Sequence, residues 1–254
     1  MIDRQKSNSI LFPAIGFIIF LLVWEIVADT GLISSTFFPP PTKIWGSILK
    51  MVGNGELVSA TAITLLRFVA GLICGSALGA ILGLMMGWWS TFGHFLNPFV
   101  AAAHPIPKIA IFPILMILFG IGEGSKFVAI LLAAFFPMLI TSLAGVQQIN
   151  NVYFEVGKNY GASKRQVLTH ILLPGSLPSL LAGLRLAGNT AFVITITVEI
   201  VAARSGLGVL LWFGWQTFRV SDLYAVLVVI SLLGILFNLL LERLTQRFVP
   251  WLGE

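Results

Sequence analysis

Residues 61–88 read TAITLLRFVAGLICGSALGAILGLMMGW, an apolar run in which Arg67 is the one charged residue. A helix that crosses the hydrocarbon core of a bilayer needs about 20 mainly apolar residues, so this run predicts a membrane-spanning helix. Glycine recurs at every fourth position of the run, at residues 71, 75, 79, 83 and 87. That spacing opens a groove along one helix face, where another backbone can approach closely. We expect packing within the chain to use this face, in preference to a seam between subunits.

The composition of the whole chain has the same character. Of its 254 residues, 57% are hydrophobic and 10% are charged, whereas soluble domains are about 25% charged. These values exclude a soluble globular protein and a disordered chain. The net charge of +5 fits the surplus of Lys and Arg that fixes membrane topology. Because no basic cluster alternates with aromatic residues, we expect no nucleic-acid partner.

Apolar stretches of spanning length occur along the full chain, which predicts one all-α integral membrane domain over residues 1–254 with six transmembrane helices. The predicted spans are Ile10–Ala28, Thr61–Trp88, Phe95–Phe119, Phe127–Val146, Leu180–Ala203 and Leu223–Leu241. The surplus of Lys and Arg in alternate loops places both termini and the loop 147–178 in the cytoplasm. On the opposite side, amphipathic patterns near residues 41–52 and 207–215 predict short helices at the membrane surface.

Prolines interrupt two of the predicted spans. The third span holds four of them, Pro98, Pro105, Pro107 and Pro113, and the fourth span holds Pro137. Each proline removes one helical hydrogen bond and clashes with the preceding turn, so both spans should kink. A moving gate and an ordinary kinked helix are two interpretations that the sequence leaves open.

The longest cytoplasmic loop predicts two short helices joined at a glycine. Gly161 can take the left-handed conformation that ends the first helix. Ser163 can cap the second helix, with Gln166 three residues later completing a capping box. Pro174 and Pro178 are then expected to break the chain before the fifth span.

The same loop carries a family resemblance. Glu155, Gly161, Ile171, Leu173 and Pro174 have the spacing E-(five residues)-G-(nine residues)-I-x-L-P. This pattern resembles the EAA loop of permease subunits of binding-protein-dependent ABC importers. One departure is that Val156 and Gly157 replace the two alanines of the family pattern, and Gly157 should loosen the first loop helix by about 1 kcal/mol relative to alanine.

The resemblance implies the type I ABC importer permease fold and a transport role without catalysis in this chain. In the family, the loop inserts into a cytoplasmic ATPase, which assigns that contact to Glu155, Gly161, Ala162 and Ser163, together with Ile171, Leu173 and Pro174. The implied partners are two ABC ATPase subunits, a second permease copy and an extracytoplasmic substrate-binding protein, at the inner membrane of a bacterial cell and in contact with its lipid. ATP and Mg would be bound by the ATPase, because this chain lacks the phosphate-binding pattern G-x-x-x-x-G-K-[ST]. We expect no cofactor or metal in the chain itself.

Further motifs narrow the resemblance to one branch. They are residues 65–67 (LLR), 105–110 (PIPKIA), 119–124 (FGIGEG) and 198–208 (VEIVAARSGLG). This branch imports nitrate, taurine, aliphatic sulfonates, bicarbonate or thiamine-precursor pyrimidines. The resemblance therefore implies alternating-access import of a small anionic nutrient. A thiamine precursor or another small organic nutrient is one alternative, and a stand-alone secondary transporter, which would need a coupling-ion site or inverted repeats, is the other.

Ionisable and polar groups inside apolar spans are candidates for the substrate pathway, because they are costly there unless they have a function. The candidates are Arg67, Lys108, Asn189, Thr195 and Glu199. Cations facing a cavity would suit an anion. The competing interpretation is structural: Arg67 reaches to the membrane surface and Glu199 pairs with a nearby cation. The sequence does not decide between the two.

Overall fold

Residues 2–31 and 33–250 are described by a computed structural model, and this part of the chain contains helices and no strands. The elements in chain order are α1 (Ile2–Asp29), α2 (Pro41–Gly53), α3 (Glu56–Trp88), α4 (Ser90–Ala103), α5 (Lys108–Phe119), α6 (Glu123–Gln147), α7 (Asn151–Asn159), α8 (Lys164–Val167), a π-helix (Leu168–Leu172), α9 (Leu173–Ala202), α10 (Leu207–Gln216) and α11 (Val220–Phe248).

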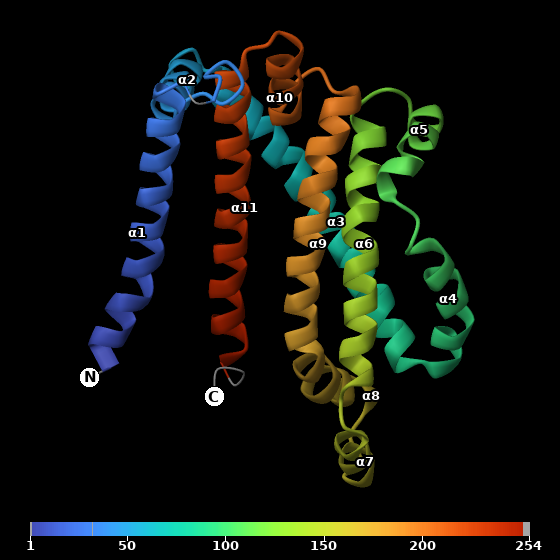
Figure 1. Ribbon diagram of the computed structural model, residues 1–254. Helices are drawn as coiled ribbons and strands as arrows, with labels where there is room; N and C mark the ends of the chain where they lie inside the picture. The colour runs from blue at the N-terminus through green and yellow to red at the C-terminus, as the bar shows by residue number, and fades with distance from the viewer. Residues whose placement is uncertain (1, 32, 251–254) are drawn as a thin grey trace.

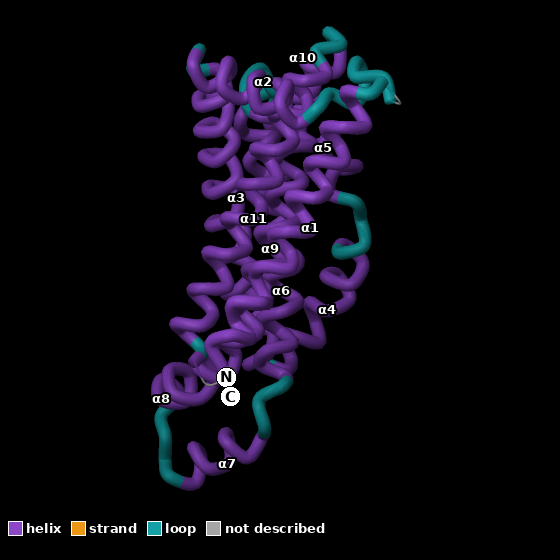
Figure 2. Tube along the Cα trace, turned by 60° about the vertical axis from the view of Figure 1, so that its left-hand side comes forward, coloured by secondary structure: helices purple, strands orange, loops and turns teal. Residues whose placement is uncertain are grey.

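The long helices α1, α3, α6, α9 and α11 run along the height of the molecule, with α4 and α5 on one flank (Figure 1). Helices α2 and α10 lie at one end. Helices α7 and α8 lie at the other end, where α1 begins and α11 ends (Figures 1 and 2). The start of the described chain, its end and the predicted cytoplasmic loop are therefore on the same side, as the sequence predicted.

Length and apolar composition identify the membrane spans. In the described residues, α3, α6, α11 and the continuous run Lys164–Ala202 are each long and apolar enough to cross a bilayer, and α4 with α5 counts as a fifth, bent span. The sixth predicted span, Ile10–Ala28, lies within α1, which is not among the described helices that meet this test. This helix meets α11 through Trp24, whose ring lies edge-on to Tyr224 with the two centroids 6.0 Å apart.

The glycine face of α3 packs along α6. A Cβ atom added at Gly79 would lie 2.5 Å from the carbonyl oxygen of Phe135, and one added at Gly87 would lie 2.5 Å from Cβ of Val146. Two further glycines of the series, Gly75 and Gly83, likewise face backbone carbonyls of α6. Without side chains in the way, the two backbones approach closely along several turns. The expected packing within the chain is confirmed.

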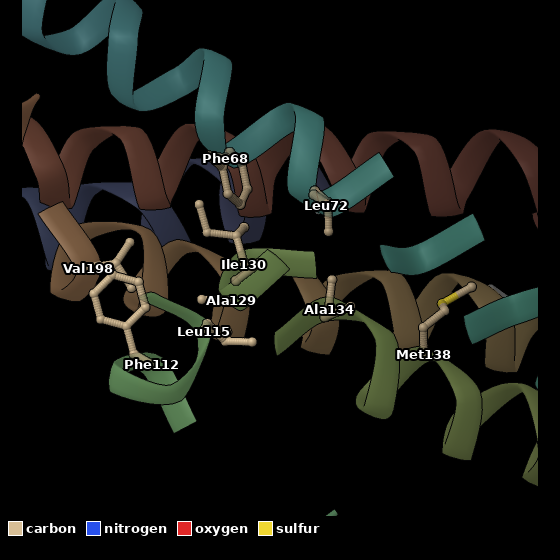
Figure 3. Packing of buried hydrophobic residues seen from close by; sticks show 11 residues of the cluster. Phe68, Leu72, Phe112, Leu115, Ala129, Ile130, Ala134, Met138 and Val198 are labelled. Atoms are coloured by element: carbon tan, nitrogen blue, oxygen red, sulfur yellow. The ribbon is translucent and has the colours of Figure 1, made fainter. Parts of the chain in front are cut away.

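The larger apolar core lies where α3, α5, α6 and α9 meet (Figure 3). Its largest fully buried side chains are Phe112 of α5 and Ile130 of α6. Small residues on α9, Ala187 and Ala191, are completely buried against them. Because lipid is as apolar as this core, close van der Waals packing holds the helices together.

The two predicted surface helices exist as α2 and α10, but their apolar faces pack on protein. Ile44 and Met51 of α2 and Leu207 of α10 are buried together with residues of α3 and α11. The start of α2 is held by Glu25 of α1, whose carboxylate accepts hydrogen bonds from the Thr42 N–H (3.1 Å) and hydroxyl (2.6 Å). The two helices therefore close one end of the bundle, while Trp45 of α2 and Trp215 of α10 stay exposed.

The third predicted span is broken, not kinked. Helix α4 ends at Ala103, α5 begins at Lys108, and the two axes differ by 96°. Pro105 and Pro107 lie in the four residues between them. Two prolines so close together remove neighbouring hydrogen bonds, and the residue before each proline disfavours helical geometry.

The expected break at Pro174 and Pro178 is wrong. The chain stays helical from Lys164 to Ala202, with Pro174 in the first turn of α9 and Pro178 further inside it. The π-helix Leu168–Leu172 ends two residues before Pro174, and the Leu173 N–H donates to the Leu168 carbonyl five residues back. Widening the turn to π geometry accommodates the proline without ending the helix.

Candidate functional site

The elbow formed by α7 and α8 projects beyond the ends of the long helices (Figures 1 and 2). Helix α7 starts at an asparagine cap, where the Asn150 side chain accepts a hydrogen bond from the Val152 N–H at 3.0 Å. At its other end the Ala162 N–H donates to Gly157 (2.8 Å) and the Gly161 N–H donates to Lys158 (3.1 Å). These two bonds form a Schellman motif, which satisfies carbonyls that the helix end would otherwise leave free.

Gly161 and Ser163 do what the sequence predicted. Gly161 has φ +70°, the left-handed conformation in which side chains are disfavoured. Ser163 accepts a hydrogen bond from the Gln166 N–H, and the Gln166 side chain accepts one from the Ser163 N–H at 2.8 Å. The predicted capping box is confirmed, and the turn between α7 and α8 is fixed by local hydrogen bonds at both sides.

The glycine at position 157 is explained by a packing contact that the sequence did not reveal. A Cβ atom at this position would lie 3.0 Å from Cδ1 of Ile171, in the π-helix. An alanine, as in the family pattern, would therefore press on Ile171, and the glycine lets α7 fold back against it. The other predicted loop residues, Glu155, Leu173 and Pro174, are exposed.

Helix α7 carries an apolar strip that faces solvent. It consists of Val152, Tyr153, Val156 and Tyr160, and Tyr160 is 88% exposed. At 100° per residue these four positions share one face of the helix, whereas Lys158 lies on the opposite face. An exposed apolar face on an element that projects beyond the bundle is typical of a protein interaction site.

The break between α4 and α5 contains a second site. The ammonium group of Lys108 donates to the carbonyl oxygens of Ala103 (3.2 Å), His104 (2.9 Å) and Ile106 (2.9 Å). It also lies 4.3 Å from the ring centroid of Phe136. Pro107 has no backbone N–H that could donate to the Ala103 carbonyl, and the Lys108 ammonium group donates to that oxygen instead.

A cavity of about 510 Å³ opens at this break, and both Lys108 and Asn189 line it. Across the cavity, Pro137 leaves the Ala133 carbonyl of α6 without its helical donor. The Thr190 hydroxyl of α9 donates to that oxygen at 2.9 Å. Asn189 is held from another helix, since the Asn238 amide of α11 donates to its side-chain oxygen at 3.0 Å. The walls are otherwise mainly apolar, so Lys108 provides a positive charge in a largely apolar cavity.

Two other predicted pathway residues pair with each other. The Arg67 Nη1 atom lies 2.7 Å from Oε1 of Glu199, whose side chain is completely buried. The same carboxylate accepts hydrogen bonds from the Thr64 hydroxyl (2.9 Å) and from the Gly208 N–H (2.9 Å). A buried carboxylate is tolerated when it has such partners. For Glu199, the interpretation of an ion pair with a nearby cation is therefore confirmed.

Arg67 makes further bonds that join three helices. Its guanidinium contacts both oxygens of Glu123 at the start of α6, each at 2.7 Å. It also donates to the Ser205 carbonyl at 2.6 Å, in the loop before α10. The Arg67 side chain is 9% exposed, so these partners enclose it. We refer to Arg67, Glu123, Glu199 and Ser205 as the arginine cluster.

The structure places the five predicted pathway residues at three separate locations. Lys108 and Asn189 share the cavity at the α4–α5 break, and Arg67 and Glu199 share the arginine cluster. Thr195 is completely buried and its hydroxyl donates to the Ala191 carbonyl of its own helix at 2.8 Å.

Sequence reasoning did not single out Thr64, Glu123, Ser205 or Asn238. For two of them a signal was present: Glu123 lies in residues 119–124 and Ser205 in residues 198–208, two of the motifs that resemble the importer branch. With Arg67 in residues 65–67, three motifs far apart in the sequence meet in the arginine cluster. Asn238 could have been found as a polar residue inside an apolar span.

Comparisons with known proteins identify the family of the chain. Residues 75–254 match the family described as binding-protein-dependent transport system inner membrane component. The chain is 34% identical to the taurine transport system permease protein TauC of Escherichia coli, over 100% of this chain and 92% of the relative. It is 26% identical to the putative aliphatic sulfonates transport permease protein SsuC of Bacillus subtilis, over 96% and 87% of the two chains.

Two further similarities extend this set. The chain is 30% identical to the formylaminopyrimidine transport permease protein ThiX of Halalkalibacterium halodurans, over 97% of this chain and 98% of the relative. A solved structure of the MetNI methionine ABC transporter matches with a TM-score of 0.61 at 19% identity, over 73% of this chain and 93% of that chain; this likeness concerns the fold. The chain belongs to the family of binding-protein-dependent transport system inner membrane components, and it is a permease of a binding-protein-dependent ABC importer.

Proposed function

We propose that two identical copies of this chain form the membrane pathway of the importer. Two cytoplasmic ABC ATPase subunits bind ATP and Mg and dock on the elbows of the two copies. An extracytoplasmic binding protein delivers the substrate at the opposite end. In this proposal the complex lies in the inner membrane of a bacterial cell, with both termini in the cytoplasm, and the permease pair alternates between outward-open and inward-open states.

The exposed apolar strip of α7 is the observation that carries the ATPase contact. Val152, Tyr153, Val156 and Tyr160 are exposed on a segment whose two ends are fixed by hydrogen bonds. An amphipathic helix of this kind binds by laying its apolar face into a groove of a partner. A rigid elbow can also transmit a movement of the ATPase to the membrane helices, whereas a flexible loop would absorb that movement. Closure of the ATPase pair would thereby move α9 through the continuous helix Lys164–Ala202.

Substitutions on α7 test this contact. Val156→Asp places a charge in the strip and should abolish co-purification of the ATPase subunit, whereas Lys158→Asp places the same side chain on the opposite face and should leave co-purification intact. Glu155→Lys should abolish ATPase activity stimulated by the loaded binding protein without lowering the melting temperature, and Glu242→Lys, a charge reversal on α11, is its control. Normal coupled turnover in Val156→Asp or Glu155→Lys would refute the proposal. Substrate transport by the purified chain alone, without nucleotide, would instead indicate a secondary transporter.

For the substrate we propose a small molecule that carries a sulfonate group, of the aliphatic sulfonate or taurine type. The cavity at the α4–α5 break supports this choice, because Lys108 offers a positive charge and Asn189 an amide within about 510 Å³. The names of the taurine and aliphatic sulfonate relatives point the same way. In this proposal Arg67, Glu199 and Thr195 support the pathway walls, since none of them lines this cavity.

Neutralising Lys108 tests the anion pathway. Lys108→Met keeps the length of the side chain and removes its charge, so uptake of labelled taurine should fall by about tenfold or more while the complex still assembles; a single cation desolvated near an anion is worth about 1.5–3 kcal/mol. Lys108→Arg keeps the charge and should retain most of the uptake. Unchanged uptake in Lys108→Met would remove Lys108 from the pathway.

The thiamine-precursor alternative rests on the similarity to the formylaminopyrimidine permease. It predicts uptake of a neutral pyrimidine that does not depend on the charge of Lys108. Measuring taurine and formylaminopyrimidine uptake side by side, in wild type and Lys108→Met, separates the two proposals.

A further inference from the structure

A groove of about 510 Å³ lies between the end of α3 and the start of α8. It is separate from the cavity at the α4–α5 break and from the apolar strip of α7. Its walls are almost wholly apolar and include Leu84 and Trp88 of α3 and Leu168 of the π-helix. Two cations, Lys164 and Arg165, line the groove beside these walls. The groove therefore combines a long apolar surface with a positively charged group of side chains.

The position of the groove places it at the membrane surface. Trp88 is the last residue of the apolar span α3, and Trp89 follows it on the same groove. Tryptophan is enriched where the hydrocarbon core meets the headgroups. The apolar walls thus lie at the depth of acyl chains, and the two cations lie near the depth of lipid phosphates.

Lys164 and Arg165 are poorly placed for their own helix. They occupy the first turn of the continuous helix Lys164–Ala202, where the helix dipole is already positive and cations are unfavourable. Both side chains are exposed, and neither forms an ion pair with the side chains that the structure describes, those of residues 12, 15–31 and 33–250. An external anion would relieve this concentration of positive charge.

We propose that this groove binds an anionic phospholipid. An acyl chain packs against Leu84, Trp88 and Leu168, and the phosphate of the headgroup lies between Lys164 and Arg165. Charge complementarity selects this occupant, since basic pockets at the membrane surface bind anionic headgroups. A second copy of the chain with its two-fold axis at the groove would instead bring the same two cations towards each other.

The site adjoins the elbow directly. Lys164 and Arg165 follow Ser163, the cap of α8, so a bound phosphate would hold the base of the elbow against the end of α3. The lipid composition of the membrane would thereby influence the element that we propose as the ATPase contact. The lipid site itself does not depend on that contact, and its test uses no ATPase.

Lipid retention by the purified full-length chain tests the proposal. The chain is mixed in detergent with equal amounts of phosphatidylglycerol and phosphatidylcholine, and the bound lipids are counted by native mass spectrometry. Each basic residue near an anionic lipid contributes about fivefold in binding, so the double variant Lys164→Gln, Arg165→Gln should lower phosphatidylglycerol retention about 25-fold. The control Lys158→Gln, Arg243→Gln loses the same charge outside the groove and should stay within about twofold of wild type.

Three further variants make the outcome decisive. Leu84→Trp narrows the groove while keeping both cations, and it should reduce retention of phosphatidylglycerol as well. If the double variant does not purify, the single variants Lys164→Gln and Arg165→Gln should each lose about fivefold. Equal retention of the two lipids by wild type, or undiminished phosphatidylglycerol retention after Lys164 and Arg165 are neutralised, overturns the proposal. A change in oligomeric state in Leu84→Trp, with lipid retention unaltered, would assign the groove to a second copy and overturn it too.

Discussion

The contact between α3 and α6 makes a quantitative prediction for Gly79→Ala. The added Cβ atom would lie 2.5 Å from the Phe135 carbonyl oxygen and 3.0 Å from the Leu139 nitrogen, whereas ordinary contacts start at 3.4 Å. The shortfall of about 0.9 Å is towards backbone atoms, so no side-chain rotation relieves it. The two helices must therefore move apart.

We expect this separation to cost about 2–3 kcal/mol, because overpacking a close contact typically costs about 1–3 kcal/mol and the shift also loosens the neighbouring turns of the seam. Gly75 faces the Leu131 carbonyl one turn away. A single displacement accommodates both new methyl groups, so Gly75→Ala combined with Gly79→Ala should cost less than the sum of the two single variants.

The loss of stability is measured by heating the detergent-purified protein and monitoring the remaining folded fraction by size-exclusion chromatography. A loss of 1 kcal/mol lowers the melting temperature of a chain of this size by about 2–4 °C, so Gly79→Ala should melt about 5–10 °C below wild type. Gly46→Ala in α2 is the matched control, since no atom lies within 4 Å of its added Cβ; it should melt at or slightly above the wild-type temperature because alanine favours helix. Equal melting temperatures for Gly79→Ala and Gly46→Ala would refute the reasoning.

Two further predictions concern the arginine cluster and the elbow. Arg67→Ala leaves the buried Glu199 carboxylate without its cation, which typically costs about 3–5 kcal/mol of stability and should reduce the yield of monodisperse protein in size-exclusion chromatography. Arg67→Ala combined with Glu199→Gln should recover part of that yield. No recovery would contradict the pairing. Gly161→Ala forces a side chain into φ +70° at a cost of about 1 kcal/mol. Because this strain is confined to the elbow, stimulated ATPase activity should fall while the melting temperature of the bundle stays within about 1 °C of wild type. A fall in both the activity and the melting temperature would place the strain in the bundle.

The elbow was largely predictable because its signals are local. Gly161, Ser163 and Gln166 act on backbone groups within a few residues, and their left-handed turn and capping box are present as expected. The helix beyond them was not predicted, since Pro174 and Pro178 suggested a break. A proline's effect depends on whether the turn before it can widen, and the π-helix Leu168–Leu172 shows that here it does.

The candidate pathway was predictable only as a set of residue types. Lys108, Asn189, Arg67 and Glu199 were singled out because charged and polar groups are costly in lipid. Lys108 bonds carbonyls within five residues, but the other partners lie far away in the sequence. Glu199 is 132 residues from Arg67, and Asn238 is 49 residues from Asn189. Which polar groups meet follows from how the helices cross, and no local pattern contains that information.

The sequence by itself determined that the chain enters a membrane, where its spans lie and which loop forms an elbow, because apolar length, glycine spacing and capping act over one helix at a time. Tertiary structure decided that the glycine face of α3 meets α6, that Arg67 joins Glu123 and Glu199, and that Lys108 caps a broken span beside a cavity. In lipid there is no hydrophobic force to select helix neighbours. Close packing and the satisfaction of polar groups select them, and both arise only when distant segments come together.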